Sequence, residues 1–262
     1  MKTIVVKIGG SLAVDDKKLA DFTLAVSKLP KDIQIAIIHG GGKDINANLA
    51  LLNEEPKFIN GLRVTTPAIM DMVEMTLSGK VNKKLVRMLL INGKNAVGIS
   101  GIDGKLLEAK PLEGKGDLGQ VGDIVNVNTA IIDKLFLGEF LPVISPISYG
   151  NGVSYNVNAD TAASEIAVAL KADCFILISD ISGVLNGEKK IIPSLNAELA
   201  KKLIAEGVIN GGMIPKVGSA FESIERGLKS IHIVGWEGSA AFISQIEGTG
   251  NTGTIIAEEL KE

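Results

Sequence analysis

The first eleven residues, MKTIVVKIGGS (residues 1–11), indicate the class of fold. A near-continuous apolar run rich in β-branched residues, TIVVKI (3–8), leads directly into two glycines. Runs without alternating polar positions are typical of strands in a parallel sheet that is covered on both faces. Comparable runs follow at 33–38, 95–100, 140–145, 174–179 and 231–235. The chain therefore predicts a mainly parallel sheet.

The segments between these runs carry helical patterns. In residues 67–90 apolar side chains recur every three or four positions, with Thr66 as the N-cap and Gly93 as the C-cap. A second helix is expected at 159–171, capped by Asn158. Further helices are expected at 15–28, 195–206 and 213–228. This alternation predicts an α/β fold, a three-layer αβα sandwich with an open sheet, whose ligands bind at the carboxyl ends of the strands.

One region departs from the alternation. Residues 102–126 are rich in glycine and charge and have no helical period, so we expect β-hairpin turns at the surface. No internal repeat or linker marks a domain boundary. We expect two lobes, residues 1–172 and residues 173–262, that divide near residue 172.

Composition excludes several classes of protein. Hydrophobic residues make up 46% and charged residues 22% of the 262 residues, which is typical of a folded globular protein. The formal net charge of -3 gives no basic surplus for a nucleic-acid backbone. Cys174 is the only cysteine and reads as a small core residue. No export signal or run of ~20 apolar residues is present. We therefore expect a cytoplasmic protein with neither nucleic acid nor membrane as a partner.

Several familiar site patterns are absent or lack their context. The pattern G-x-G-x-x-G occurs at 114–119 and 248–253, but neither copy opens a helix after a strand as a dinucleotide site requires. No P-loop sequence G-x-x-x-x-G-K-[ST] occurs. Two histidines and one cysteine support neither a zinc cluster nor a Cys–His catalytic pair. His39 reads as a packed structural histidine rather than a catalyst.

Glycines and charged residues follow the first two strands. Lys7 precedes Gly9 and Gly10, and three glycines, Gly40 to Gly42, follow the run 33–38. Glycines let backbone N–H groups approach an anion closely, and a lysine adds a full charge. The alternative at Lys7 is a tight turn with a solvated lysine. At Gly40 to Gly42 each glycine costs backbone entropy on folding, and a turn that needs one glycine would rarely use three. A close approach of a ligand to the backbone is therefore the favoured explanation.

Four further motifs carry polar groups. They are NGLRVTTP (60–67) with Arg63, YNVNAD (155–160), ILISDISGVL (176–185) and INGGMIPKVGSA (209–220) with Lys216. Arg63 could grip a carboxylate with its bidentate fork or form a surface ion pair. Helix capping accounts for a polar residue at either position 158 or position 160, but it hardly accounts for Asn156 as well. This inventory suits phosphoryl transfer, in which positioning and charge supply most of the catalysis.

In order and spacing, these motifs resemble the amino acid kinase family over nearly the whole chain. KIGGS (7–11) is shared across that family, whereas HGGG (39–42), NGLRVT (60–65), the VEM…GKVNK helix (73–83) and NVNAD (156–160) resemble members that phosphorylate N-acetylated glutamate. SDISGVL (179–185) and GGMIPKV (211–217) resemble nucleotide-lobe motifs of the family. The resemblance implies ATP-dependent phosphorylation of the γ-carboxylate of N-acetyl-L-glutamate, a step of arginine and ornithine biosynthesis.

The same resemblance implies a role for each site residue. Lys7 and Lys216 would stabilise the transferring phosphoryl group, and Asp160 would hold both lysines in place. The residues that bind the acylated amino acid would be Gly41, Gly42, Arg63 and Asn156, with Arg63 on its α-carboxylate. Those that bind the nucleotide would be Gly10, Asp180, Ile181, Ser182, Gly183, Val184, Leu185, Val208, Ile209 and Asn210. Mg²⁺ would be held largely by phosphate oxygens and water, so no protein ligand is expected. The γ-carboxylate is already ionised at neutral pH, so no general base is required.

The resemblance also implies partners and leaves alternatives open. Residues 1–172 would bind the acylated amino acid and form a homodimer through the helix 67–90, and residues 173–262 would bind ATP. The same chemistry on N-succinylglutamate or on carrier-linked aminoadipate is one alternative. A non-catalytic small-molecule sensor on the same fold is another. The presence of both Lys7 and Lys216 favours the enzyme.

Overall fold

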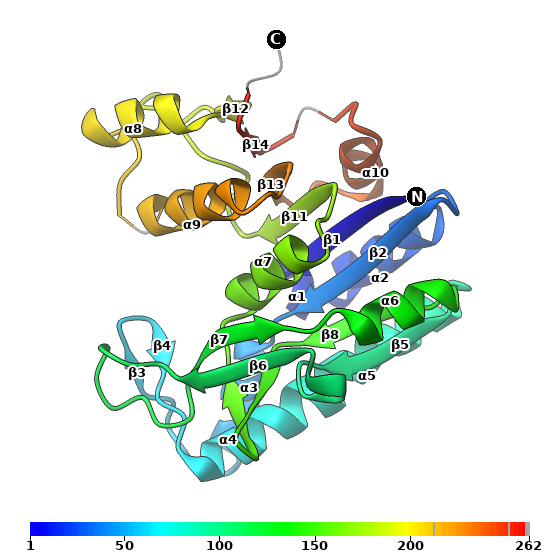
Figure 1. Cartoon of the computed structure of the whole chain (residues 1–262), viewed down its shortest axis with the longest axis vertical. Coiled ribbons are helices and arrows are strands. Elements are labelled where there is room, and N and C mark those ends of the chain that lie inside the picture. Colours follow the sequence, from blue (N-terminus) through cyan, green and yellow to red (C-terminus); the bar gives the residue numbers. More distant parts are fainter. Residues whose placement is uncertain (212, 251, 260–262) are drawn as a thin grey trace.

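The computed structural model describes residues 1–211, 213–250 and 252–259, and its elements form a central sheet between two layers of helices (Figure 1). The sheet has the strand order β12-β14-β13-β11-β1-β2-β8-β5. Its strands are β1 Lys2–Ile8, β2 Ile33–His39, β5 Ala96–Ser100, β8 Leu141–Ser145, β11 Cys174–Ser179, β12 Ser194–Leu195, β13 Ser230–Gly235 and β14 Thr254–Ala257. β13 and β14 pair antiparallel, and the other neighbours pair parallel. The predicted αβα sandwich with a mainly parallel open sheet is confirmed.

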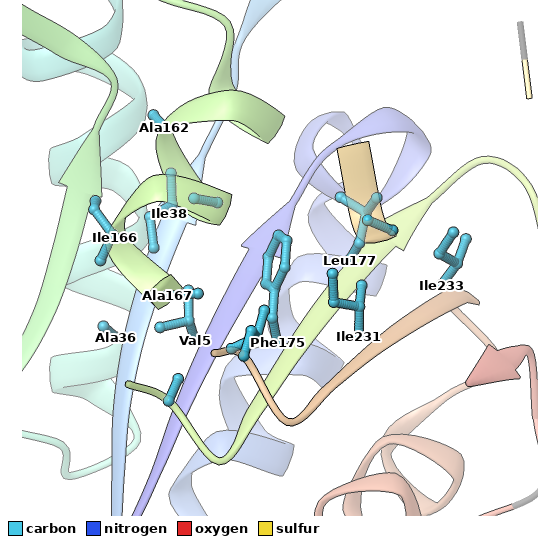
Figure 2. Packing of buried hydrophobic residues seen from close by; sticks show 14 of the residues in the cluster. Val5, Ala36, Ile38, Ala162, Ile166, Ala167, Phe175, Leu177, Ile231 and Ile233 are labelled. Atoms are coloured by element: carbon cyan, nitrogen blue, oxygen red, sulfur yellow. The ribbon is translucent and has the colours of Figure 1, made fainter. Parts of the chain in front are cut away.

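The two faces of the sheet are covered by different helices. α2 (Asp16–Ser27), α5 (Asn82–Ile91) and α10 (Ser239–Glu247) pack on Ile4, Val6 and Ile8 of β1. α6 (Ala130–Leu137), α7 (Ala159–Ala169) and α9 (Met213–Glu225) pack on the other face, where Val5 contributes to the core. Figure 2 shows Ala162, Ile166 and Ala167 of α7 beside Val5 and Ile38, with which they share a core. Because side chains alternate along a strand, Lys7 shares the face of Val5 and points toward the α7 side.

The predicted helix at 67–90 is confirmed, but its centre was not expected. It consists of α4 (Pro67–Glu74), a π-helical segment (Met75–Val81) and α5. Thr66 caps it, since its Oγ1 accepts a hydrogen bond from the Ile69 N–H at 3.3 Å. Gly93, with φ 79°, follows the C-cap residue Asn92. Sequence periodicity could not show the π-helical segment, because its apolar residues still recur every three or four positions.

A second sheet lies beside the first, with the order β10-β9-β6-β7. Its strands are β6 (Leu107–Pro111), β7 (Gly122–Val127), β9 (Ile147–Gly150) and β10 (Val153–Asn156). β6 and β7 form the hairpin expected in residues 102–126, with a 3₁₀ turn (Asp103–Lys105) before it. The prediction of a surface location was wrong for part of this region, because Leu106 and Leu107 are fully buried. These leucines join the core under α7.

The remaining elements are short. α1 (Gly10–Val14), α3 (Gly42–Leu51), α8 (Ala197–Ala205) and the hairpin of β3 (Phe58–Ile59) with β4 (Leu62–Arg63) complete the fold. Predicted helices 15–28, 195–206 and 213–228 correspond to α2, α8 and α9. α6, α10 and the short strands were not predicted. No helix among the described residues has the length and apolar character needed to cross a membrane.

Candidate active site

The carboxyl ends of β1 and β2 open onto two adjoining cavities. The Asn156 cavity, of about 200 Å³, is bounded by Asn156, Leu77 and Val121 among others. The Lys7 cavity, of about 370 Å³, is bounded by Lys7, Gly9 and Asn46 among others. Five residues line both cavities: Gly40, Gly41, Gly42, Phe58 and Arg63. These volumes suit small metabolites, since pockets for drug-sized ligands measure roughly 300–1,000 Å³.

Lys7 forms an ion pair with Asp160 of α7, which covers the same face of the sheet. Its Nζ lies 2.7 Å from Asp160 Oδ1. Asn158 caps α7 by accepting hydrogen bonds from the N–H groups of Asp160 and Thr161, which places Asp160 in the first turn of the helix. Gly9 leaves room for this pair, because a Cβ at that position would lie 2.1 Å from Lys7 Nζ and would displace the ammonium. The glycine therefore lets the ammonium fold back over the loop toward Asp160.

The three glycines after β2 have different surroundings. A Cβ on Gly41 would lie 2.6 Å from Leu77 Cδ2 and 3.2 Å from Val81 Cγ2, so the π-helical segment leaves no room for a side chain. A Cβ on Gly42 would have no protein atom within 4 Å, although Gly42 lines both cavities. The protein's own packing therefore explains the glycine at position 41, whereas the surroundings of Gly42 leave open space beside the cavities.

Arg63 is buried, and the described part of the chain places no carboxylate against it. It is 8% exposed, and its Nη2 donates to Asn46 Oδ1 at 2.5 Å and to the Gly42 carbonyl at 3.4 Å. Its guanidinium carbon lies 4.9 Å above the Phe58 ring. Burial lowers the pKa of Arg63 from its ordinary value, but an arginine still carries its charge at neutral pH. Its Nη1 is buried and has no hydrogen-bond partner among the described residues. Such a group is costly unless a ligand satisfies it.

Asn156 lies at the end of β10, in the wall of the Asn156 cavity. Its Nδ2 donates to Thr65 Oγ1 at 3.1 Å, and that hydroxyl donates to the Arg63 carbonyl at 2.9 Å. Because this chain of bonds connects Asn156 to Arg63, the structure brings two of the predicted substrate-binding residues into one cavity. Sequence reasoning missed Thr65, whose hydroxyl forms a hydrogen bond with each of these two residues.

The predicted nucleotide residues lie beside this region. Gly10 begins α1 directly after β1. Asp180 to Leu185 follow β11, and in that loop the Val184 N–H donates to Thr254 Oγ1 at 2.7 Å. Val208, Ile209 and Asn210 connect α8 to α9, and Ile209 packs in the same core as Val184. Gly10 thus follows the carboxyl end of β1, residues 180–185 follow that of β11, and residues 208–210 precede α9.

Lys216 lies in the first turn of α9 and is half-buried. α9 is joined to α7 by Arg226, whose guanidinium donates to Glu165 at 2.5 and 2.8 Å, and by Ser223, whose Oγ lies 2.6 Å from Ser164 Oγ. The two helices run in the same direction (Figure 1), so the starts of both lie toward the carboxyl edge of the sheet. Among the described residues, no carboxylate lies within 4.0 Å of Lys216 Nζ. The structure thus brings Asp160 to Lys7 and shows no ion pair between Asp160 and Lys216.

His39 and Asn82 form a buried polar group behind the glycines, and sequence reasoning missed Asn82. Both side chains are 0% exposed, and Asn82 Nδ2 lies 3.2 Å from His39 Nε2. Burial lowers the pKa of His39 to about 4, so the ring is neutral at physiological pH. The signal in the sequence was an asparagine on the apolar stripe of the helix at 67–90. Asn46, which holds Arg63, gave no such signal because it lies on a half-buried face of α3.

The site contains no ready-made metal centre among the residues that the structure describes. No group of three or more histidine, cysteine, aspartate or glutamate side chains gathers in these parts of the chain. The residues that line the cavities include Lys7, Arg63 and the glycines Gly40 to Gly42, and such cations and backbone N–H groups suit anionic ligands.

Comparison with known proteins supports a shared ancestry. The sequence profile of the amino acid kinase family matches residues 2–235. An acetylglutamate kinase of Caldanaerobacter subterraneus is 45% identical over 264 residues, covering 98% of this chain and 88% of that protein. One of Petrotoga mobilis is 42% identical, covering 98% and 87%. A solved structure from Streptococcus mutans, smu.665, is 28% identical with a TM-score of 0.77 and covers 98% of this chain and 99% of that one. The chain therefore belongs to the amino acid kinase family.

Proposed function

We propose that the chain transfers the γ-phosphoryl group of ATP to the γ-carboxylate of N-acetyl-L-glutamate, giving N-acetyl-γ-glutamyl phosphate for arginine and ornithine biosynthesis. The observation that carries this proposal is the unpartnered, buried Nη1 of Arg63 in a cavity that also holds Asn156 and the glycines. A cation held by neutral groups keeps its full attraction for a ligand carboxylate. The acetylglutamate kinases at 45% and 42% identity support the choice of substrate.

The two lysines have separate places in this proposal. Lys7 lines a cavity beside Gly41 and Gly42, where its ammonium would meet the negative charge of the transferring phosphoryl group. Lys216 would meet the same group from the start of α9. Asp160 would orient the lysines, beginning with Lys7, to which it is paired at 2.7 Å. Gly41 and Gly42 would offer backbone N–H groups to the acylated amino acid, and Gly10 would offer one to phosphate.

ATP would extend from this centre along the C-terminal part of the chain. Asp180 to Leu185 and Val208 to Asn210 would follow the nucleotide. Residues 1–172 would then act as the lobe for the acylated amino acid and 173–262 as the lobe for ATP. Mg²⁺ would accompany ATP through phosphate oxygens and water, where it neutralises phosphate charge. The acceptor carboxylate attacks as an anion, so no protein group has to remove a proton.

The proposed setting of the enzyme is a homodimer in the cytoplasm. Its support is the apolar end of α5, where Leu90 is 51% and Ile91 83% exposed. Exposed apolar side chains that adjoin one another are typical of a protein interface. β5, which packs under α5, is also an edge strand of the central sheet.

The test is ADP release measured with a coupled assay on the whole chain. N-acetylglutamate, N-succinylglutamate and free glutamate are compared at equal concentrations with MgATP. The proposal predicts the highest kcat/KM for N-acetylglutamate and little turnover of free glutamate. Preference for N-succinylglutamate would select the alternative acyl group. No turnover of any acylated amino acid, in a protein that still binds one, would indicate a sensor.

A further inference from the structure

His39 connects the end of β2 to the glycines through one hydrogen bond. Its Nδ1 lies 2.9 Å from the carbonyl oxygen of Gly40, the next residue. Its other ring nitrogen, Nε2, faces Asn82 Nδ2 at 3.2 Å. Both side chains are fully buried, and His39 lines neither the Asn156 cavity nor the Lys7 cavity. His39 is therefore linked to the cavity wall through the Gly40 peptide and does not itself line either cavity.

The surroundings of Asn82 fix which nitrogen of His39 carries the proton. The Lys83 ammonium donates to Asn82 Oδ1 at 3.1 Å, and Asn82 Nδ2 donates to the Val143 carbonyl at 2.9 Å. These partners orient the amide so that its NH₂ group faces the histidine. Asn82 Nδ2 also lies 3.3 Å from the Ile99 carbonyl, so three acceptors share its two hydrogens. A proton on Nε2 would face this NH₂ group, and the Gly40 carbonyl beside Nδ1 can only accept, so the single proton of the neutral ring lies on Nδ1. Nδ1–H is thus a donor aimed at the Gly40 oxygen.

This bond determines where the next N–H group points. The peptide between Gly40 and Gly41 is trans, so its C=O and N–H point in opposite directions. The Gly40 oxygen points into the core toward His39, and the Gly41 N–H therefore points away from the core. The Gly40 N–H is already bonded to the Ile8 carbonyl, and the Gly41 carbonyl accepts from Ile45. Within the described parts of the chain, no acceptor lies within hydrogen-bonding distance of the Gly41 N–H.

We propose that His39 is a positioning residue that holds the Gly41 N–H toward the cavities, and that Asn82 selects the tautomer that makes this possible. The ligand of this N–H would be a negatively charged oxygen of the reacting carboxylate or phosphoryl group, which rests on the function proposed above. A glycine peptide can turn over freely, because glycine tolerates nearly all backbone angles. A fixed donor is more effective than a mobile one, since it needs no reorganisation as charge develops.

Two variants of His39 separate positioning from packing. In His39→Asn the side-chain amide can occupy the place of Nδ1 and still donate to the Gly40 oxygen, but the link to Asn82 is lost. In His39→Gln the amide can occupy the place of Nε2 and keep Asn82 satisfied, but nothing donates to the Gly40 oxygen. Glutamine is also closer to histidine in volume. A purely structural role therefore predicts that His39→Gln is the better tolerated variant.

Positioning predicts the opposite order for kcat. His39→Gln should lower kcat by about tenfold or more, since removal of a fixed donor costs up to 10²–10³-fold, whereas His39→Asn should stay within about threefold of the unchanged protein. The KM for ATP should stay the same in both, and thermal unfolding should verify that both are folded. Higher kcat in His39→Gln than in His39→Asn would overturn the proposal.

Two readouts do not depend on the reaction. In ¹⁵N NMR spectra at pH 6–8, His39 should show a protonated, pyrrole-type Nδ1 and an unprotonated, pyridine-type Nε2. A crystal structure of His39→Gln should show the Gly40–Gly41 peptide turned over or in two orientations. The opposite tautomer, or an unchanged peptide in His39→Gln, would overturn the inference. If the unchanged protein releases no ADP with N-acetylglutamate, the proposed function fails, and these two readouts still decide the role of His39.

Discussion

Lys7 Nζ lies 2.7 Å from Asp160 Oδ1, and the lysine side chain is 12% exposed while that of the aspartate is 38% exposed. The residues are far apart in the sequence, but β1 and α7 bring them together at the carboxyl edge of the sheet. The carboxylate compensates the buried ammonium while the site holds no anion. An arriving phosphoryl group would meet an ammonium that is already oriented.

Removal of either lysine should affect the rate more than binding. Lys7→Ala and Lys216→Ala should each lower kcat by about a hundredfold or more and change both KM values much less, because each ammonium meets charge that is fully developed only in the transition state. Steady-state kinetics measure this. Lys202→Ala is the matched control, since Lys202 is exposed on α8 and pairs weakly with Glu206 at 4.0 Å. A Lys216→Ala protein with full kcat would refute its assignment.

Substitution of Arg63 should weaken the binding of only one of the two substrates. Arg63→Ala should raise the KM for the acylated amino acid on the order of a hundredfold and leave the KM for ATP unchanged, because a ligand carboxylate in the Asn156 cavity would lose its charged partner. Arg63→Lys keeps the charge without the planar fork, so an intermediate KM is expected. An increase in the KM for ATP alone would contradict the placement of the acylated amino acid.

His39 should make the fold sensitive to mild acid. Burial lowers its pKa from 6.5 to about 4, so between these values the unfolded chain binds a proton that the folded protein does not. The free energy of unfolding should be unaffected above pH 6.5 and fall by up to about 3 kcal/mol as the pH drops to 4. Urea unfolding at pH 7 and pH 4.5 measures this loss.

The matched control for that measurement is His39→Asn, which has no titrating ring and should lose less stability over the same range. Asp173 affects the stability of the fold in a different pH range. Its hydrogen bond from Lys229 lowers its pKa below 3.8, so the stability it contributes is lost only at lower pH. An equal loss in the unchanged protein and in His39→Asn would show that His39 does not titrate with unfolding.

The apolar end of α5 should associate with a second copy of the chain. Sedimentation at micromolar concentration should give the mass of a dimer. Ile91→Lys should shift the equilibrium toward the monomer, because a charge would replace a side chain that is 83% exposed in the single chain and buried in the dimer. Lys110→Ala on β6, also exposed, serves as the control. A monomer for the unchanged protein would contradict the proposed interface.

The sequence predicted most long elements and most of the chemistry, because both have local signatures. Continuous runs such as 3–8 and 174–179 became central strands, and Thr66 and Asn158 cap the helices that they were expected to begin. The π-helical segment lacked a signature, although it brings Leu77 against Gly41. The contact of Lys7 with Asp160 came only from resemblance to a family. The bonds of Asn46 with Arg63 and of Asn82 with His39 depend on tertiary packing, which no spacing in the sequence records.

The most direct test of the central claim is to trap the product. Hydroxylamine converts an acyl phosphate to a hydroxamate, so incubation with MgATP, N-acetylglutamate and hydroxylamine should give N-acetylglutamyl hydroxamate in equal amount to ADP. The product should carry the hydroxamate at the γ-carboxyl group, because Arg63 is expected to hold the α-carboxylate away from the reaction. ADP formed without hydroxamate, or hydroxamate at the α-carboxyl group, would contradict the proposed reaction.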